Sequence, residues 1–394
     1  MMDLKEKVIA AVDRLTPELI ELSHKVHENP EVAMQEHKAV AWQVELLKSY
    51  GFTVTTPYCG MDTAYRAVKG TPGKGPQLGI LAEYDALKGM GHACGHNIIC
   101  ATSCGAAIAL AEVLEGQEAC VYLFGAPAEE AIGGKIPMAE NGAFEGLDCA
   151  MMMHPSADRD EVGGFGLACV GVAVEFFGKA AHSSRPMDGI NALTSTIALF
   201  NAVNAQLHLW PNKSKINGII TAGGSASNII PEYCACDFLL RAEHKFQILE
   251  MYDDFVRLAN AAAAMTGAKV KITPEPIYAE RYSNHALDTA FVANMKTLGR
   301  ECTWADPTAM VGSSDIGNVS LELPTIHTSL SMNAPGVVGH TPEYREAAIS
   351  EGGDALISLG AKGLAMTCID VFESPQLREA MWAEYNEKVK PYRC

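Results

Sequence analysis

Short apolar strands alternate with helices in the first part of the chain, and this alternation most restricts the possible fold. Strand-like runs at Leu78–Glu83, Ala119–Gly125 and Asp148–Met153 are almost continuously apolar, as in strands that are covered on both faces. A mostly buried helix, Asn97–Leu114, is predicted between the first two. Because polar residues follow each strand, we expect an α/β fold with a mixed sheet flanked by helices and a site at the carboxyl ends of its strands.

Other helices and strands are predicted on both sides of this region. Apolar residues at helical spacing predict helices over Asp3–Val26, Glu36–Tyr50, His285–Leu298, about Pro342–Phe372 and Ser374–Val389. Short strands are expected at Thr53–Thr55, Tyr65–Val68 and Thr325–Ser329, and a glycine-rich loop at Val311–Gly317.

The pattern changes near Ala168, where half-exposed strands replace fully apolar ones. The order strand, helix, two strands, helix, strand predicts a small α+β insert. The first domain is therefore expected to be discontinuous, residues 1–167 and 282–394, with the insert over 168–281. The elements expected in the insert are Cys169–Gly178, Ile190–Leu207, Lys215–Ala222, Tyr233–Arg241, Lys245–Thr266 and Lys269–Thr273.

Charge and cysteine usage restrict the partners and the compartment. A formal net charge of −17 over 394 residues argues against nucleic acid or an anionic membrane as a partner. No apolar run reaches the ~18 residues of a spanning helix, and the charged start lacks the pattern of an export signal. The 12 cysteines lie mostly in apolar stretches, and we interpret Cys234-Ala-Cys236 as strand packing. We expect free thiols and a cytoplasmic protein.

The stretch His92-Ala-Cys-Gly-His96 holds two imidazoles and a thiol within five residues. In an extended segment positions 92, 94 and 96 would point the same way. Neutral imidazole and thiolate are good ligands for a divalent metal such as zinc. With 12 Cys and 12 His in the chain, a chance cluster is the alternative.

Further candidate ligands follow other predicted elements. Glu129 and Glu130 come after a buried strand, where a pair of carboxylates is costly unless a cation neutralises it. In a metal site one Glu would bind the metal and the other would carry protons. A solvated turn that caps the next helix is the alternative. His154 ends a strand and His340 lies in a glycine loop, and each taken singly could be an ordinary structural histidine.

Several polar residues have less specific patterns. Asp85 could orient a ligating imidazole, or it could be an ordinary turn aspartate. His182, Asn191 and Asn228 lie in the insert without ligand spacing, as surface residues often do. Arg241 closes an apolar strand and could recognise a substrate carboxylate, or could pair with Glu243.

Taken together and in order, these motifs resemble the amidohydrolase branch of the metallopeptidase family that contains aminoacylase, carboxypeptidase G and the indole-acetyl-amino-acid hydrolases. The resemblance covers nearly the whole chain. The motifs that carry it are His92-Ala-Cys-Gly-His96, Glu129-Glu130, Met153-His154-Pro155, Ala181-His182-Ser183, Gly189-Ile-Asn191-Ala192, Asn228-Ile-Ile-Pro231 and Gly339-His340-Thr341.

The resemblance implies a di-metal catalytic domain with an inserted lid domain that often mediates dimerisation. By this resemblance Glu129 is the general base and Asp85 a supporting carboxylate. His182 matches a lid histidine that, in dimeric relatives, reaches the neighbouring subunit's site and steadies the oxyanion. Asn191, Asn228 and Arg241 are the candidate substrate-binding residues. The implied metal ligands are Cys94, His96, Glu130, His154 and His340.

One departure narrows the resemblance. Many members of that branch have Asp after the second histidine of the first motif, whereas this chain has Asn97. With Glu83-Tyr-Asp-Ala-Leu87 and Ser313-Ser-Asp-Ile-Gly-Asn-Val319, the chain is more similar to β-alanyl-lysine dipeptidase and aminobenzoyl-glutamate hydrolase subunits.

We therefore expect a metal-dependent amidohydrolase that removes an N-acyl or N-aminoacyl group from an amino acid. Two divalent ions, zinc or manganese with cobalt possible, would activate water, and Glu129 would act as general base. The chain is expected to form a homodimer through the lid domain and to act on a small dipeptide or N-acyl amino acid. The alternatives are a deacylase instead of a dipeptidase, and a catalytically silent binding or regulatory protein that retains the fold.

Overall fold

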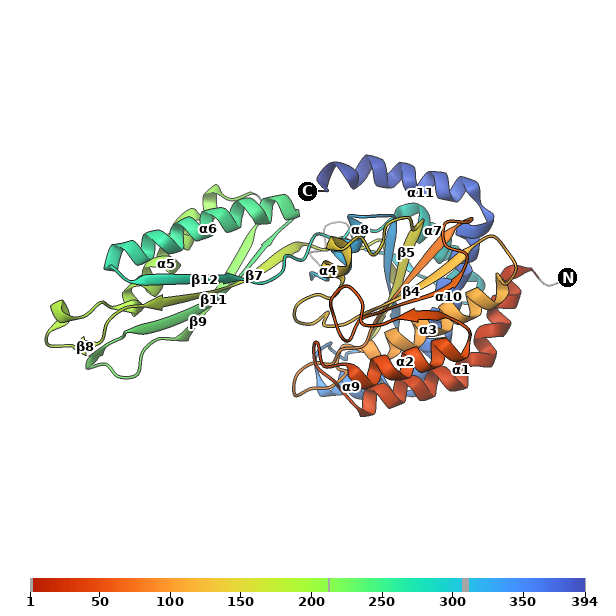
Figure 1. Cartoon of the computed structure of the whole chain (residues 1–394), viewed down its shortest axis with the longest axis horizontal. Helices are drawn as coiled ribbons and strands as arrows, with labels where there is room; N and C mark the ends of the chain where they lie inside the picture. Colours follow the sequence, from red (N-terminus) through yellow and green to blue (C-terminus); the bar gives the residue numbers. More distant parts are fainter. Residues whose placement is uncertain (1–2, 212, 307–311, 394) are drawn as a thin grey trace. The chain divides into compact units, whose positions relative to one another are not determined.

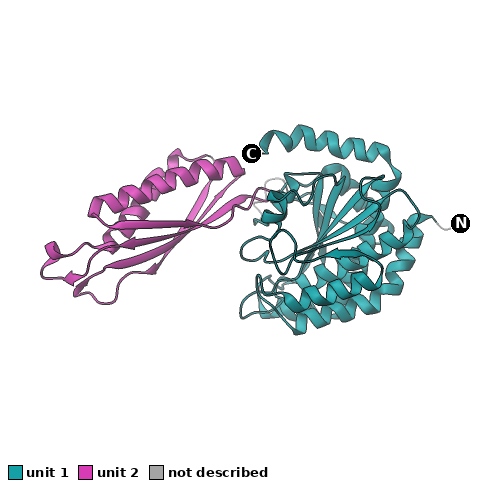
Figure 2. Cartoon of the chain, viewed as in Figure 1, with its two compact units in different colours: residues 1–165, 281–393 teal, residues 166–280, 394 magenta. Residues whose placement is uncertain are grey.

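The protein is represented by a computed structural model that describes residues 3–211, 213–306 and 312–393. The chain divides into two compact units (Figure 2), the first formed by residues 1–165 with 281–393 and the second by Gly166–Glu280. The boundaries expected from the sequence, after 167 and after 281, lie within two residues of these. The lid role of the second unit stays a prediction.

The first unit is built around an eight-stranded mixed sheet (Figure 1), ordered β1-β2-β4-β3-β5-β14-β6-β13. The central strands β4, β3, β5 and β14 run parallel, whereas β1, β2 and β6 add antiparallel pairings. This arrangement confirms the predicted fold class. The strands span Thr53–Thr55 (β1), Tyr65–Gly70 (β2), Gln77–Glu83 (β3), Cys120–Ala126 (β4), Cys149–Ser156 (β5), Glu161–Val162 (β6), Thr303–Trp304 (β13) and Thr325–Ser331 (β14).

Helices of the first unit cover the sheet on both faces. Since successive side chains of a strand point to opposite faces, each central strand contributes to two cores. Ile80 and Met151 join the larger core beneath α1, α2, α3, α7 and α10. Leu81 and Met152 join a second core that includes α4 and α8 residues. The helices span Leu4–Glu28 (α1), His37–Ser49 (α2), His96–Val113 (α3), Lys135–Glu140 (α4), His285–Thr297 (α7), Ile316–Ser320 (α8), Pro342–Ala347 (α9), Glu351–Glu373 (α10) and Pro375–Lys388 (α11).

Two predictions for the last third of the chain need adjustment. The single helix expected up to Phe372 is two helices, α9 and α10. Ser350 separates them because its side chain accepts the amide of Gly353 and so starts a new helix. Part of the predicted loop Val311–Gly317 begins α8 at Ile316, and Val311 lies outside the described residues.

Helices α3 and α10 are long and apolar enough, by length and composition alone, to cross a membrane. In the structure, however, 89% and 67% of these segments are buried inside the protein. Both helices belong to the larger core of the first unit, where they pack against each other. Their apolar composition is therefore explained by burial within the fold.

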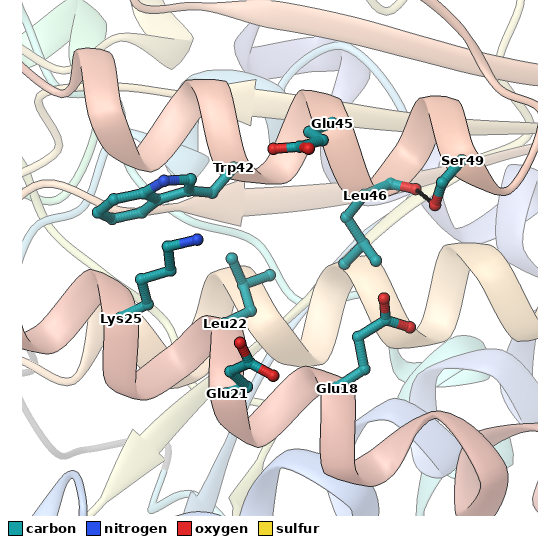
Figure 3. Close-up of a pocket in the computed structure, with 8 residues that line it drawn as sticks. All are labelled: Glu18, Glu21, Leu22, Lys25, Trp42, Glu45, Leu46 and Ser49. Carbon is teal, nitrogen blue, oxygen red and sulfur yellow. Dashed lines mark hydrogen bonds between the residues drawn. The ribbon is translucent and has the colours of Figure 1, made fainter.

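Helices α1 and α2 lie side by side and line a pocket at the surface (Figure 3). Leu22 of α1 and Leu46 of α2 point toward each other, and both are buried. Lys25 places its ammonium 4.9 Å from the centroid of the Trp42 ring. Both leucines belong to the larger core of the first unit, whereas Glu21, Lys25 and Glu45 are exposed.

The second unit is a four-stranded antiparallel sheet, ordered β12-β7-β11-β9, with α5 and α6 packed on it (Figure 1). Cys234 and Cys236 lie buried in β11, in agreement with strand packing. A small ladder joins β8 to β10. The elements are Ala168–Phe177 (β7), Ala181–His182 (β8), Ala192–Gln206 (α5), Lys215–Ala222 (β9), Ile229–Ile230 (β10), Tyr233–Ala242 (β11), Lys245–Thr266 (α6) and Lys269–Pro274 (β12).

Candidate metal centre

The predicted metal ligands lie together at the carboxyl ends of the central strands of the first unit. The ligand atoms of Cys94, His96 and His154 all lie within 4.8 Å of one another, and so do those of Cys94, Glu130 and His340. Cys94 Sγ lies 3.4 Å from His154 Nε2, and His340 Nε2 lies 3.3 Å from Glu130 Oε1. Two overlapping groups with Cys94 in common therefore offer places for two cations.

His92 is not among the predicted ligands and does not join these groups, since the segment is not extended through residue 96. Gly95 has a φ of 79° and turns the chain into α3, so His96 is the first residue of that helix. A Cβ at Gly95 would lie 2.5 Å from Pro155 Cγ, so only glycine fits. The His92 ring is buried 6.1 Å from that of His27, and burial lowers the pKa of His92 to about 3.

Asp85 contacts two of the candidate ligands, His96 and Glu130. His96 Nδ1 lies 3.0 Å from Asp85 Oδ1 and 2.9 Å from the Asp85 carbonyl oxygen. A backbone carbonyl can only accept, so Nδ1 carries a proton, and Nε2 is the ring nitrogen that could bind a metal. The other carboxylate oxygen of Asp85 accepts the backbone amide of Glu130 at 3.0 Å.

Two more backbone contacts fix the remaining ligands. His154 Nδ1 lies 2.7 Å from the carbonyl oxygen of Pro155, which directs Nε2 toward Cys94. His340 lies in a loop held by the bond from its own amide to the carbonyl of Ala93, at 2.9 Å. The loop that carries Cys94 and the loop that carries His340 are therefore joined directly.

Two orphaned polar atoms test whether the site fits a metal. Within the described part of the chain, His96 Nε2 and Glu130 Oε1 are buried 4.0 Å apart, and neither makes a hydrogen bond. Their nearest charged neighbours are Glu83 Oε2, 3.5 Å from His96 Nε2, and His340 Nε2, 3.3 Å from Glu130 Oε1. Buried polar atoms nearly always have a hydrogen-bond partner, and a cation between these two atoms would satisfy both. Imidazole nitrogen, thiol sulfur and carboxylate oxygen form the ligand set of zinc and similar divalent cations. The residues present fit the predicted metals.

The buried Cys94 thiol can bind a metal only in its deprotonated form. Burial raises the pKa of Cys94 to about 12. A thiol must lose its proton to bind a metal, and a bound cation supplies the charge that stabilises the thiolate.

We predict that Cys94→Ser lowers metal content and activity together, because a hydroxyl is a poor substitute for a thiolate ligand. The matched control is Cys234→Ser, which makes the same change at a buried cysteine of β11 and should alter neither property. Elemental analysis of both purified variants, alongside hydrolysis rates, checks the prediction. Equal metal stoichiometry in wild type and Cys94→Ser would remove Cys94 from the ligand set.

Glu129 lies beside a buried charge cluster that the sequence analysis missed. Lys135 is fully buried, and its ammonium bonds to Glu83 and, at 2.5 Å, to Asp315. Carboxylate oxygens of Glu83, Glu129 and Asp315 lie within 4.8 Å of one another. Burial, together with the charges of Glu83 and Asp315, raises the pKa of Glu129 well above its usual range. The cluster suits Glu129 for accepting a proton.

A second missed pair adjoins His154. Arg281 donates a hydrogen bond from Nη1 to His327 Nδ1, and the His327 ring lies edge-on to that of His154 with centroids 5.6 Å apart. Burial, reinforced by the Arg281 charge, holds the pKa of His327 well below its usual range, so this imidazole is neutral. Neither residue belongs to a local sequence pattern that could have revealed it.

The remaining predicted residues lie in the second unit. His182 is exposed in β8 and pairs with Ile229, the residue that follows Asn228. Asn191 caps the start of α5. Arg241 lies near the opposite end of β11. His182 pairs with Ile229 of β10, which precedes Tyr233, the first residue of β11, by four positions. At ~3.4 Å per residue the eight steps from Tyr233 to Arg241 span about 27 Å. Arg241 therefore lies far along β11 from the end that is near His182. Glu243, the alternative partner of Arg241, bonds to Lys213 at 2.7 Å.

Known proteins resemble this chain over most of its length. The family model for peptidase family M20/M25/M40 matches residues 75–361. The chain is 34% identical to the Xaa-Arg dipeptidase of Mus musculus, over 98% of this chain and 93% of the relative. It is 24% identical to one of the subunits of the p-aminobenzoyl-glutamate hydrolase of Escherichia coli K12, over 100% of this chain and 98% of the relative.

A solved structure shows the same fold. The YXEP protein of Bacillus subtilis, a dinuclear metal-binding peptidase, superposes with a TM-score of 0.67 at 19% identity. The match covers 91% of this chain and 99% of that protein. At this identity the likeness concerns the fold alone.

Proposed function

We propose that the substrates of this chain are dipeptides with a cationic C-terminal residue. The chain belongs to peptidase family M20/M25/M40 and is a metal-dependent amidohydrolase, and the proposal proceeds from this. The observation that carries the proposal is the 34% identity to the mouse Xaa-Arg dipeptidase over nearly the whole chain, against 24% to the relative from the p-aminobenzoyl-glutamate hydrolase. A net charge of −17 also favours attraction of a cationic substrate.

In this proposal the protein's own groups divide the work of hydrolysis. Cys94, His96, Glu130, His154 and His340 would hold two divalent ions, which, when bound, activate a water and polarise the scissile carbonyl. Glu129 takes the proton of the attacking water and passes it to the amine nitrogen as the amide C–N bond breaks. The products are a carboxylate and a free amino acid.

The identity of the metals belongs to the proposal. Thiolate and imidazole ligands favour zinc, whereas the carboxylate ligands also accept manganese or cobalt. Elemental analysis of protein purified without added metal, followed by chelation and reconstitution with each ion, tests this choice. Full recovery of activity with manganese but not with zinc would contradict the proposal that zinc is the metal of the active protein.

We propose that the second unit acts as a lid and that the chain forms a homodimer through it. Strand β9 is an edge strand, and Ile219 and Ile220 on it are 59% and 46% exposed. Edge strands with apolar side chains favour pairing with another chain. His182 would then steady the oxyanion, and Asn191, Asn228 and Arg241 would bind substrate. A mass in solution equal to one chain would contradict the dimer.

A cytoplasmic location is also proposed. All the cysteines within the described residues are unpaired, which suits a reducing compartment. Recovery of the protein in a membrane or exported fraction would contradict it.

We predict that Ala-Arg and Ala-Lys are hydrolysed with a kcat/KM roughly 10- to 100-fold above that for Ala-Glu, the effect of one hydrogen bond to a charged group. Amino-acid release from a panel measures this, with N-acetyl-arginine as the test of whether the free amino group is needed. Faster hydrolysis of p-aminobenzoyl-glutamate or of N-acetyl amino acids would replace the dipeptidase proposal with a deacylase.

A further inference from the structure

The turn that carries Glu129 and Glu130 has an unusual backbone. Ala128 follows β4 with a φ of +60°, in the left-handed region that residues with a Cβ rarely adopt. Its carbonyl accepts the amides of Ile132 at 3.2 Å and Gly133 at 2.8 Å, which closes the turn behind Glu129. A conformation of this kind persists only when surrounding groups hold it.

A buried carboxylate from a distant part of the chain holds this turn. Glu36 precedes α2, and its Oε1 accepts the amide of Ala128 at 2.9 Å and that of Met34 at 3.0 Å. Met34 also has a left-handed φ, +62°. The Glu36 side chain makes no capping bond to its own helix and is 0% exposed. One oxygen atom therefore supports two left-handed residues that lie more than 90 positions apart.

Glu129 lies between two anchored amides. On one side Glu36 holds the amide of Ala128, and on the other Asp85 holds the amide of Glu130 at 3.0 Å. Asp85 also orients His96, so its contact belongs to the metal ligands. The Glu36 contact acts on the residue directly before Glu129 and reaches no candidate ligand.

The two Glu36 oxygens differ in their surroundings. Oε2 is buried without a hydrogen-bond partner among the described residues. Burial raises the pKa of Glu36 to about 7. Oε1 can accept both amides whether or not the carboxyl group is protonated, so the contact needs an acceptor at the right distance and does not need a charge.

From this geometry we propose that Glu36 is a positioning residue for Glu129, which it holds in place by accepting the amide of Ala128. The inference rests on the proposed role of Glu129 as general base. It assigns a task to a residue that belongs to none of the ligand groups found among the described residues and does not cap its own helix.

The test compares two variants that separate distance from charge. Glu36→Asp keeps the carboxylate but shortens the side chain by one methylene, so it cannot reach both amides. Glu36→Gln keeps the length and the acceptor oxygen but removes the charge. The matched control is Glu31→Asp, since Glu31 Oε2 likewise accepts two amides, those of Lys38 and Ala39 at 2.8 and 3.1 Å, at the start of α2.

We expect Glu36→Asp to lower kcat by about 10- to 100-fold, the effect of a small displacement of a reacting group. KM and metal stoichiometry should stay within about two-fold of wild type, as expected for a change that touches no ligand. Glu36→Gln and Glu31→Asp should keep kcat within about three-fold. Turnover is measured with the best substrate of the panel. Deuterium uptake of the metal-loaded protein over residues 127–134 should rise in Glu36→Asp alone.

A Glu36→Asp protein with wild-type kcat and unchanged uptake over the turn would overturn the inference. So would a Glu36→Gln protein as impaired as Glu36→Asp, because the charge would then matter more than the contact. Failure of the proposed function looks different: Glu129→Gln would stay active, whatever the Glu36 variants do. Melting temperatures of all variants exclude global unfolding as the cause.

Discussion

Glu129→Gln is expected to reduce kcat by about 10²–10⁴-fold while both metals stay bound, since general base catalysis alone contributes a factor of this size. The amide has nearly the shape of the carboxylate but cannot accept the proton of the attacking water. Glu129 is not needed for either of the two ligand groups that share Cys94. Single-turnover and steady-state rates, with elemental analysis of the same preparations, measure the outcome.

The control for this experiment is the adjacent carboxylate. Glu130 lies 3.3 Å from His340 and belongs to a ligand group, so Glu130→Gln should lower metal content as well as rate. Activity of Glu129→Gln within a few-fold of wild type would show that Glu129 is not the base. Loss of metal from Glu129→Gln would instead make it a ligand, an option that the group of His96, Glu129 and Glu130 also allows.

The buried cluster beside Glu129 explains why its carboxylate is suited to proton transfer. Glu83 and Asp315 share the single positive charge of Lys135, so a net negative charge remains beside Glu129. Glu129 places a carboxylate oxygen within 4.8 Å of both. Like charges close to a buried carboxylate favour its protonated form. In its ionised form such a group is a stronger base than an exposed glutamate.

Local pattern was a good guide to the elements and to the place of the site. Continuous apolar runs predicted β3, β4 and β5 to within a few residues, because burial on both faces leaves a clear signal. Polar residues after those strands then indicated the sheet edge at which Cys94, Glu130 and His154 meet. The specific roles of these residues came from the resemblance to a family, and the comparisons confirm that the chain belongs to it.

The sequence could not show the contacts between residues that lie far apart in the chain. Lys135 and Asp315 are separated by 180 positions, and Arg281 and His327 by 46. No periodicity marks such pairs, since each residue stands alone in its segment. The separate position of His92 has a local cause: a single left-handed glycine, Gly95, turns the chain into α3, so the segment is not extended through residue 96.

The second large effect is expected from His182→Ala, which should lower kcat by about 10²–10³-fold, the usual cost of removing one oxyanion donor. Metal content should not change, because His182 lies in the second unit and in none of the ligand groups found among the described residues. Its ring is exposed and held by Ser184 at 2.7 Å, so the loss of the side chain should not unfold the unit. Ser184→Ala is the milder control, because it removes the hydroxyl contact but leaves the bond from the Ser184 amide to His182 Nδ1 at 3.2 Å.

Subunit mixing decides whether His182 acts in its own chain or in its partner. If it acts across the dimer, mixing inactive His182→Ala with inactive Glu129→Gln gives mixed dimers in which one of the two sites is intact. Random exchange of equal amounts makes half of the dimers mixed, so about a quarter of the wild-type activity should return. If His182 acts within its own chain, each site of a mixed dimer keeps one defect, and activity stays at the level of the separate variants. Distinct affinity tags on the two variants verify exchange, and exchange without recovery of activity would exclude the arrangement across the dimer.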